Sequence, residues 1–167
     1  MPNFHVAIIG GGLCGLALAV ALRRRKISFT VYESRGSFTE LGAGINVSPN
    51  SRTAFSLIDP ALTEAFYMNA ARNSSPREGL WFDIRLGAAT ETRQDGETIT
   101  SLMAPPIGNT CIGRNDLLQI LAEKAGLLDG PGRENAAFNE KLIEFRETTT
   151  TSVRRRHLST CQRCHWV

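Results

Sequence analysis

The sequence predicts an α/β fold that starts with a strand, a glycine-rich turn, a helix and a second strand. Residues 5–9 (HVAII) form a short, mostly apolar run, which is typical of a parallel strand buried on both faces. Residues 13–25 are rich in Leu and Ala and end in arginines, as expected for a helix. Residues 28–33 (SFTVYE) are β-branched and aromatic, which favours a strand. Together these elements predict a βαβ unit with a right-handed crossover.

The turn after the first strand has the spacing of a phosphate-binding loop. Gly10, Gly12 and Gly15 follow the pattern G-x-G-x-x-G. In such a loop the first glycine allows a tight turn, the second lets the backbone approach a pyrophosphate, and the third lets helix and strand pack closely. Glu33 ends the second strand, where its carboxylate can accept hydrogen bonds from a ribose diol. The sequence therefore predicts a dinucleotide site at the N-terminus of the helix.

These motifs do not decide which dinucleotide binds. An acid at position 33 would repel a 2′-phosphate, which argues against NADP at this site. It does not separate FAD from NAD. The glycines alone could also form a tight turn without a ligand, but the register of strand, loop, helix, strand and acid favours the site.

The middle of the chain predicts short helices and a hairpin. Helices are expected over residues 51–57 and 61–68, with Asp59-Pro60 breaking the chain between them. Asp95-Gly96 is a hairpin dipeptide, so paired strands are expected on either side of it, over residues 80–86 and 97–102.

One more helix and one more strand are expected towards the C-terminus. Apolar residues recur on one helical face over residues 117–125, where Asn115 or Asp116 would cap the start and Gly126 would end the helix. Residues 137–145 are expected to form a strand.

The bulk properties fit a globular protein of one domain in the cytoplasm. The chain has 167 residues, of which 42% are hydrophobic and 21% charged. The four cysteines do not suggest a disulfide framework, which favours a reducing compartment. The uncharged run over residues 6–22 contains glycines and is followed by basic residues, so neither a membrane span nor a signal peptide is expected.

The last twenty residues differ in composition from the rest. They hold four arginines and no acid, so residues 1–147 are expected to bind the cofactor and residues 148–167 to form a basic, disordered tail. Cys161, Cys164 and His165 match a haem-attachment pattern, and with His157 they could form a zinc site. The lack of an export signal and of a second ligand pair argues against both. No metal, haem or nucleic-acid partner is expected.

Four stretches together resemble the FAD-dependent aromatic monooxygenases, the family that contains salicylate hydroxylase and para-hydroxybenzoate hydroxylase. The resemblance is strongest to fungal members that hydroxylate polyketides in secondary metabolism. The stretches are residues 5–15, 31–35 (VYESR), 41–50 (LGAGINVSPN) and 114–118 (RNDLL), with a fainter match at 138–142. The resemblance implies a Rossmann-like FAD-binding domain in an enzyme that hydroxylates an aromatic substrate with NAD(P)H and O2.

Carried over to the matching positions, the resemblance implies roles at the adenosine end of FAD. Gly10, Gly12 and Gly15 would hold the pyrophosphate. Glu33 would bind the adenosine ribose, and Arg35 would lie beside it. A solvated surface arginine is the alternative reading for Arg35.

The resemblance also implies residues near the flavin. Ala43 and Gly44 would lie close to it, because small residues let the backbone approach. Arg114 would reach the cofactor from the start of its helix, and an exposed ion pair is the alternative reading for it. No catalytic residue is implied.

The relatives carry later elements that this sequence lacks. These are an Asp-Gly motif, a Gly-Asp motif and a sheet that covers the substrate; Asp129-Gly130 lies in a different sequence context. We therefore expect an FAD-binding domain that is incomplete relative to the family, from a truncated monooxygenase. Two alternatives stay open: a non-catalytic nucleotide-binding fragment or inactive gene product, and an NAD-dependent dehydrogenase, against which residues 43–50 argue.

Overall fold

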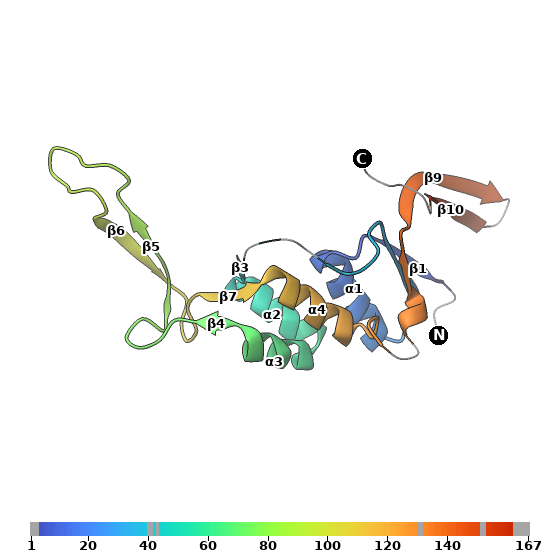
Figure 1. Cartoon of the computed structure of the whole chain (residues 1–167), viewed down its shortest axis with the longest axis horizontal. Coiled ribbons are helices and arrows are strands. Elements are labelled where there is room, and N and C mark those ends of the chain that lie inside the picture. The colour runs from blue at the N-terminus through green and yellow to red at the C-terminus, as the bar shows by residue number, and fades with distance from the viewer. Residues whose placement is uncertain (1–3, 40–41, 43, 130–131, 151–152, 162–167) are drawn as a thin grey trace. The chain divides into compact units, whose positions relative to one another are not determined.

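The strand–helix–strand order predicted for the first residues is present in the computed structural model of the chain (Figure 1). The structure describes residues 4–39, 42, 44–129, 132–150 and 153–161. The chain divides into two compact units, the first made of residues 1–41 and 117–167 and the second of residues 42–116. Its length alone predicts one domain, so this division is a finding of the structure.

The first unit contains a parallel sheet with the order β1-β2-β8. β1 (Val6–Ile9), α1 (Leu13–Arg24) and β2 (Phe29–Glu33) confirm the predicted βαβ unit, with bounds that differ from the prediction by at most one residue. β8 (Ala136–Phe138) runs parallel to the end of β2. Ile8 and Val31 are buried in this sheet, whereas Ile9 at the end of β1 is 45% exposed, so the expected burial of the first strand on both faces does not hold at Ile9.

Two helices supply the apolar side chains that pack in the first unit. α4 (Arg114–Lys124) begins one residue before the predicted cap position Asn115, and Gly126 ends it with φ +70°. The predicted apolar face is confirmed, because its members are all buried: Leu117, Leu118, Leu121, Ala122 and Ala125. α1 buries Leu16, Ala19 and Val20.

The end of the first unit differs from the sequence prediction. Asn139, with φ +60°, interrupts the strand expected over residues 137–145, so β8 ends before β9 (Lys141–Thr150) begins. β9 pairs antiparallel with β10 (Val153–Cys161) as a hairpin. The expected boundary at 147/148 therefore falls inside a strand, and residues expected to be disordered are paired. The threonine-rich composition after residue 147 favours extended backbone. The prediction of a disordered tail rested on the excess of arginines over acids and did not take this preference into account.

The part of the haem and zinc patterns that includes Cys164 and His165 lies outside the described residues. Cys161 ends β10.

The short 3-10 helix η1 (Arg133–Asn135) precedes β8.

The second unit has two helices that are each started by a side-chain cap. α2 (Pro49–Ile58) and α3 (Pro60–Asn69) confirm both predicted helices and extend them. The Ser48 hydroxyl accepts a hydrogen bond from the Ser51 N–H at 3.2 Å, and the Asp59 carboxylate accepts one from the Ala61 N–H at 3.0 Å. Proline follows each cap, where its missing N–H leaves no helix bond unmade.

A small antiparallel sheet with the order β3-β7-β4 completes the core of the second unit. β3 (Gly44–Asn46), β4 (Ala71–Arg72) and β7 (Thr110–Gly113) were not predicted, because strands of two to four residues are too short to show a period. Ile112 of β7 is buried, as are Leu62 and Phe66 of α3.

Arg52 of α2 is a buried cation in the same unit, with 9% of its surface exposed. Its guanidinium donates hydrogen bonds to the carbonyl oxygens of Ile107 (2.8 Å) and Gly108 (2.9 Å) and to the hydroxyl of Thr110 (3.4 Å). The Thr110 hydroxyl in turn donates to the carbonyl oxygen of Val47 at 2.9 Å. The hydrogen bonds of Arg52 thus connect α2 to the segment that leads into β7.

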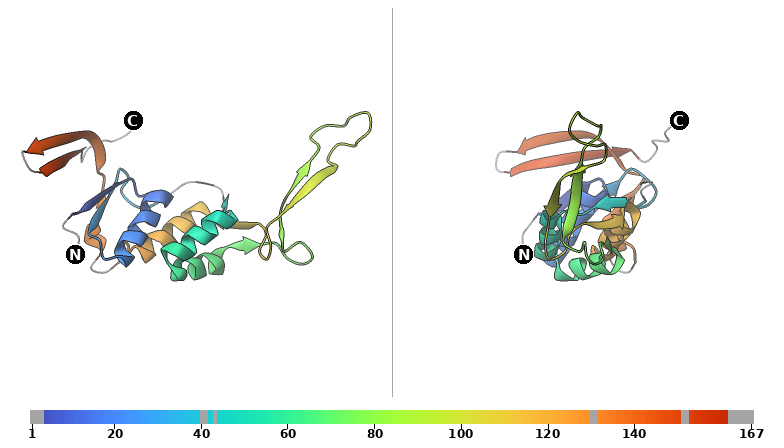
Figure 2. Two further views of the ribbon diagram at one scale, coloured as in Figure 1. Left: turned by 180° about the vertical axis from the view of Figure 1, so that it is seen from behind. Right: turned by 90° about the vertical axis from the view of Figure 1, so that its left-hand side faces the viewer.

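The predicted hairpin is confirmed as β5 (Leu80–Arg85) paired with β6 (Thr98–Met103). It extends away from α2 and α3 of its own unit in Figure 1 and in the left view of Figure 2. Asp83 lies opposite Ser101, whose hydroxyl donates a hydrogen bond to the Asp83 carboxylate at 2.7 Å. This bond, with the hydrogen bond and charge of Arg77 and a hydrogen bond from Arg85, holds the pKa of Asp83 below its usual value.

We predict that Ser101→Ala raises the pKa of Asp83 towards its ordinary value, because the largest cause of the lowering is removed. A carboxyl group whose pKa is lowered by folding stabilises the folded state above its unfolded pKa, and the effect is lost as pH falls through the folded pKa. The variant and wild-type hairpins should therefore converge in stability at low pH. An NMR titration of the Asp83 carboxyl carbon measures the pKa directly.

The matched control is Thr100→Ala, which removes a neighbouring hydroxyl that lies opposite Ile84. It should leave the Asp83 titration where it is. An Asp83 titration that is the same in wild type and Ser101→Ala would contradict the prediction.

Candidate dinucleotide-binding site

The glycine loop links β1 to α1 in the first unit. Gly10 has φ +97°, which only glycine adopts readily, and its N–H donates to the carbonyl oxygen of Tyr32 at 2.8 Å. Gly12 is the N-cap of α1, and because glycine has no side chain it cannot cap the helix with a side-chain hydrogen bond. The first N–H groups of a helix lack intrahelical acceptors, and here no side-chain cap covers them. This helix start can therefore bind an anion.

The structure gives the glycines of this loop different steric roles. A Cβ atom on Gly15 would lie 2.0 Å from the carbonyl oxygen of Gly10, so α1 can pack against the loop only with glycine there. A Cβ atom on Gly11 would lie 2.5 Å from the ring of Phe38, a constraint that the sequence analysis missed. A Cβ atom on Gly12 would meet nothing within 4 Å. Gly12 thus borders open space, where a ligand can approach the backbone.

The Glu33 carboxylate holds the loop against the end of β2. It accepts hydrogen bonds from the N–H of Gly11 at 2.7 Å and from the N–H of Arg35 at 2.8 Å. The Ser34 hydroxyl adds a bond at 3.2 Å. Because an ionised carboxylate has about four acceptor positions, one remains for a further donor. The acid is therefore fixed in place and can still accept a hydrogen bond.

These residues surround a cavity of about 240 Å³ in the first unit. Gly12, Glu33 and Arg35 all line it, so the structure brings together three of the residues that the sequence analysis chose. Arg35 is exposed, and its guanidinium donates to the carbonyl oxygen of Thr39 at 3.0 Å. The remaining lining residues are Gly11, Ser34, Ser37, Phe38, Thr39 and Leu118.

A second cavity of about 340 Å³ shares Phe38 with the first. The rings of Phe38 and Phe138 meet edge to face, with centroids 4.7 Å apart. Leu127 also lines this cavity. The Gln119 side chain donates to the carbonyl oxygen of Phe38 at 2.6 Å and so fixes this segment to α4. No sequence motif marks Phe38, which explains why it was not predicted.

The other predicted residues belong to the second unit. Ala43 lies outside the described residues. Gly44 pairs with Gly113, and a Cβ atom on it would lie 2.9 Å from the sulfur of Cys111, so packing within the sheet is sufficient to require glycine there. Arg114 is exposed at the start of α4. The structure places Gly44 opposite Gly113, the residue before Arg114, and the cofactor roles of Ala43, Gly44 and Arg114 stay predictions.

No group of three His, Cys, Asp or Glu in the described part of the chain could hold a metal ion. None of the described helices is long and apolar enough to cross a bilayer.

Comparisons with known proteins place the chain among flavin enzymes. Residues 8–46 match the family described as NAD(P)-binding Rossmann-like domain. The chain is 38% identical over 144 residues to 6-methylsalicylate 1-monooxygenase of Aspergillus terreus, which covers 85% of this chain and 30% of that protein. It is 33% identical over 120 residues to salicylate hydroxylase of Pseudomonas putida, covering 71% of this chain and 26% of that protein. The chain belongs with the salicylate-hydroxylase-like FAD-dependent monooxygenases. It spans about 30% of the length of the first of these relatives.

Solved structures of this kind show the same fold. A salicylate hydroxylase in a substrate complex superposes with a TM-score of 0.66 at 23% identity, covering 94% of this chain and 33% of that chain. CtdE in complex with FAD superposes with a TM-score of 0.63 at 17% identity, covering 96% of this chain and 35% of that chain. The predicted Rossmann-like α/β fold is therefore confirmed.

We predict that Gly15→Ala destabilises the chain by about 1–3 kcal/mol, because the added methyl group forces α1 away from the loop backbone. Chemical denaturation measures the loss. Gly87→Ala is the control, since a Cβ atom there would meet nothing within 4 Å, and its unfolding free energy should stay close to wild type. Equal stability of the two variants would show that α1 is not packed as closely as the structure indicates.

Proposed function

We propose that this chain binds FAD and forms the FAD-binding portion of a monooxygenase that uses NAD(P)H and O2 to hydroxylate an aromatic substrate. The observation that carries the proposal is the glycine loop at the start of α1, held in place by Glu33 beside an open cavity. The names of the relatives support the chemistry, since one is a salicylate hydroxylase and another a 6-methylsalicylate monooxygenase. A role in fungal secondary metabolism is part of the same proposal.

The described residues fit the adenosine end of FAD. Gly12 borders open space and α1 presents uncapped N–H groups, which suits the pyrophosphate. Glu33 keeps acceptor capacity for a ribose hydroxyl, and Arg35 lines the same cavity. The aromatic cavity next to it, formed by Phe38 and Phe138, suits the flat adenine ring.

When bound, FAD supplies the redox chemistry: it accepts electrons from NAD(P)H and allows one oxygen atom of O2 to be transferred to the substrate. The protein's residues bind and orient the cofactor. The proposal places Ala43, Gly44 and Arg114 towards the flavin end and names no catalytic residue.

Several further points belong to this proposal. The FAD-binding portion includes the βαβ unit and the glycine loop, and the protein acts in the cytoplasm, which the free thiols of Cys14 and Cys111 support. The main alternative is a nucleotide-binding module without catalytic activity. An NAD-dependent dehydrogenase is the second alternative, favoured by the match of residues 8–46 to a family described by NAD(P) binding.

We predict that FAD binds the chain and that Glu33→Ala weakens this binding about 10- to 150-fold, because a hydrogen bond to a charged group is worth about 1.5–3 kcal/mol. Gly12→Ala should also weaken binding, since its methyl group occupies the open space at the helix start. A titration followed by flavin fluorescence measures both dissociation constants. Unfolding curves of each variant show whether the fold is kept.

Gly87→Ala again serves as the control and should bind FAD as wild type does. Binding of NADH in place of FAD would favour the dehydrogenase. FAD affinity that is unchanged in both Glu33→Ala and Gly12→Ala would remove the assignment of this site.

A further inference from the structure

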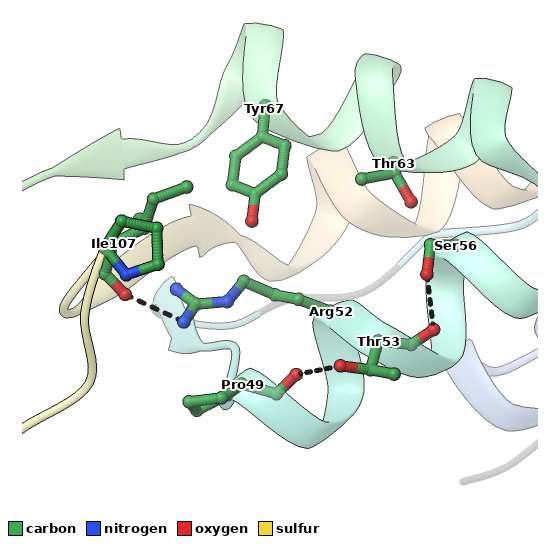
Figure 3. Close-up of a pocket in the computed structure, with 8 residues that line it drawn as sticks. Pro49, Arg52, Thr53, Ser56, Thr63, Tyr67 and Ile107 are labelled. Atoms are coloured by element: carbon green, nitrogen blue, oxygen red, sulfur yellow. Dashed lines mark hydrogen bonds between the residues drawn. The ribbon is translucent and has the colours of Figure 1, made fainter.

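A cavity of about 330 Å³ lies in the second unit, lined by residues of α2, α3 and the segment before β7 (Figure 3). None of its lining residues belongs to the dinucleotide site. Its polar side chains are hydroxyls and the guanidinium of Arg52. Its apolar walls include Pro49, Pro106 and Ile107.

The hydroxyl groups of this cavity differ in whether they already have an acceptor. Those on α2 are used within the helix: Thr53 donates to the carbonyl oxygen of Pro49 at 3.1 Å, and Ser56 donates to that of Thr53 at 2.8 Å. The Thr63 hydroxyl on α3 is buried and has no partner among the described residues. No hydrogen bond of the Tyr67 hydroxyl is found in the described part of the chain, and this group is directed towards Arg52 (Figure 3). Two donors on α3 are thus without an acceptor.

Arg52 adds a positive charge to the same cavity. Its guanidinium has five N–H donors, and three hydrogen bonds to neutral oxygens are found for it. No ion pair between Arg52 and a carboxylate is found in the described part of the chain. A buried charge without a counterion favours an anion that can reach it.

We propose that this cavity binds a small organic carboxylate with an apolar body. Arg52, Thr63 and Tyr67 can all donate hydrogen bonds, so the group they recognise must accept them. Arg52 is the one cation among the described residues that line the cavity, and a single cation calls for one negative charge, which matches a carboxylate. The prolines and Ile107 require an apolar body, and the volume limits it to the size of one ring or a short chain.

The test titrates the intact chain, without FAD, with benzoate as the probe, and follows binding by ligand-observed NMR. We expect saturable binding that weakens about 10-fold or more in Thr63→Val and in Tyr67→Phe, because each loses a hydrogen bond to a charged group. Ser56→Ala is the matched control, since its hydroxyl lines the same cavity but already donates to the Thr53 carbonyl. Ser56→Ala should bind benzoate as wild type does.

Two further measurements separate this proposal from a purely structural role. Thr63→Val replaces an unpartnered buried hydroxyl by a methyl group, so without benzoate it should be at least as stable as wild type while binding more weakly. Benzamide, which lacks the charge, and inorganic phosphate, which lacks the apolar body, should each bind at least 10-fold more weakly than benzoate.

The proposal is overturned if benzoate does not bind or if its affinity is unchanged in Thr63→Val and Tyr67→Phe. Equal affinity for benzamide or for phosphate would overturn the assignment of a carboxylate with an apolar body. Loss of stability in Thr63→Val would show that the hydroxyl has a structural partner and would overturn the premise.

Discussion

The contact between the Glu33 carboxylate and the Gly11 N–H, 2.7 Å long, is the interaction on which the first unit's binding site depends. It connects the loop after β1 to the end of β2, and the Arg35 N–H fixes the same carboxylate from the other side. The close packing of Gly15 on the Gly10 carbonyl then sets where α1 starts. An acceptor held by two backbone donors loses little further freedom when a ligand binds, which supports the proposal that Glu33 accepts hydrogen bonds from a ribose.

The elements that were predictable from sequence are those whose signal is local. The βαβ unit could be predicted because apolar runs, glycine spacing and a terminal acid all fall within residues 5–33. The hairpin was marked by Asp95-Gly96, and α4 by its apolar period. Strands such as β4 (Ala71–Arg72) have no such signal, because they exist only through pairing with β7. The hairpin of β9 and β10 was missed because charge composition was given more weight than the preference of threonine for extended backbone.

In the candidate site, too, only residues that belong to a local sequence motif could be predicted. Gly12, Glu33 and Arg35 could be chosen from a motif, and the structure places them around one cavity. Phe38 could not be chosen, because its importance comes from a fold that brings it against Gly11 and Phe138. Gly44 shows the opposite case, since sheet packing against Cys111 accounts for a glycine that the resemblance assigns to the cofactor. A motif identifies the residue type that a position needs, whereas only the packing shows which constraint requires it.

The cavity beside Glu33 and the cavity beside Arg52 present side chains of opposite hydrogen-bonding character. At Glu33 the protein presents a negative acceptor that is fixed by backbone donors, so its ligand must donate, as a ribose diol does. Around Arg52 it presents a cation and two hydroxyls, Thr63 and Tyr67, so its ligand must accept. A carboxylate placed against the Glu33 side chain itself would be repelled, and a diol would leave the charge of Arg52 without a counterion. The acceptor at Glu33 and the donors around Arg52 therefore call for different chemical groups on their ligands.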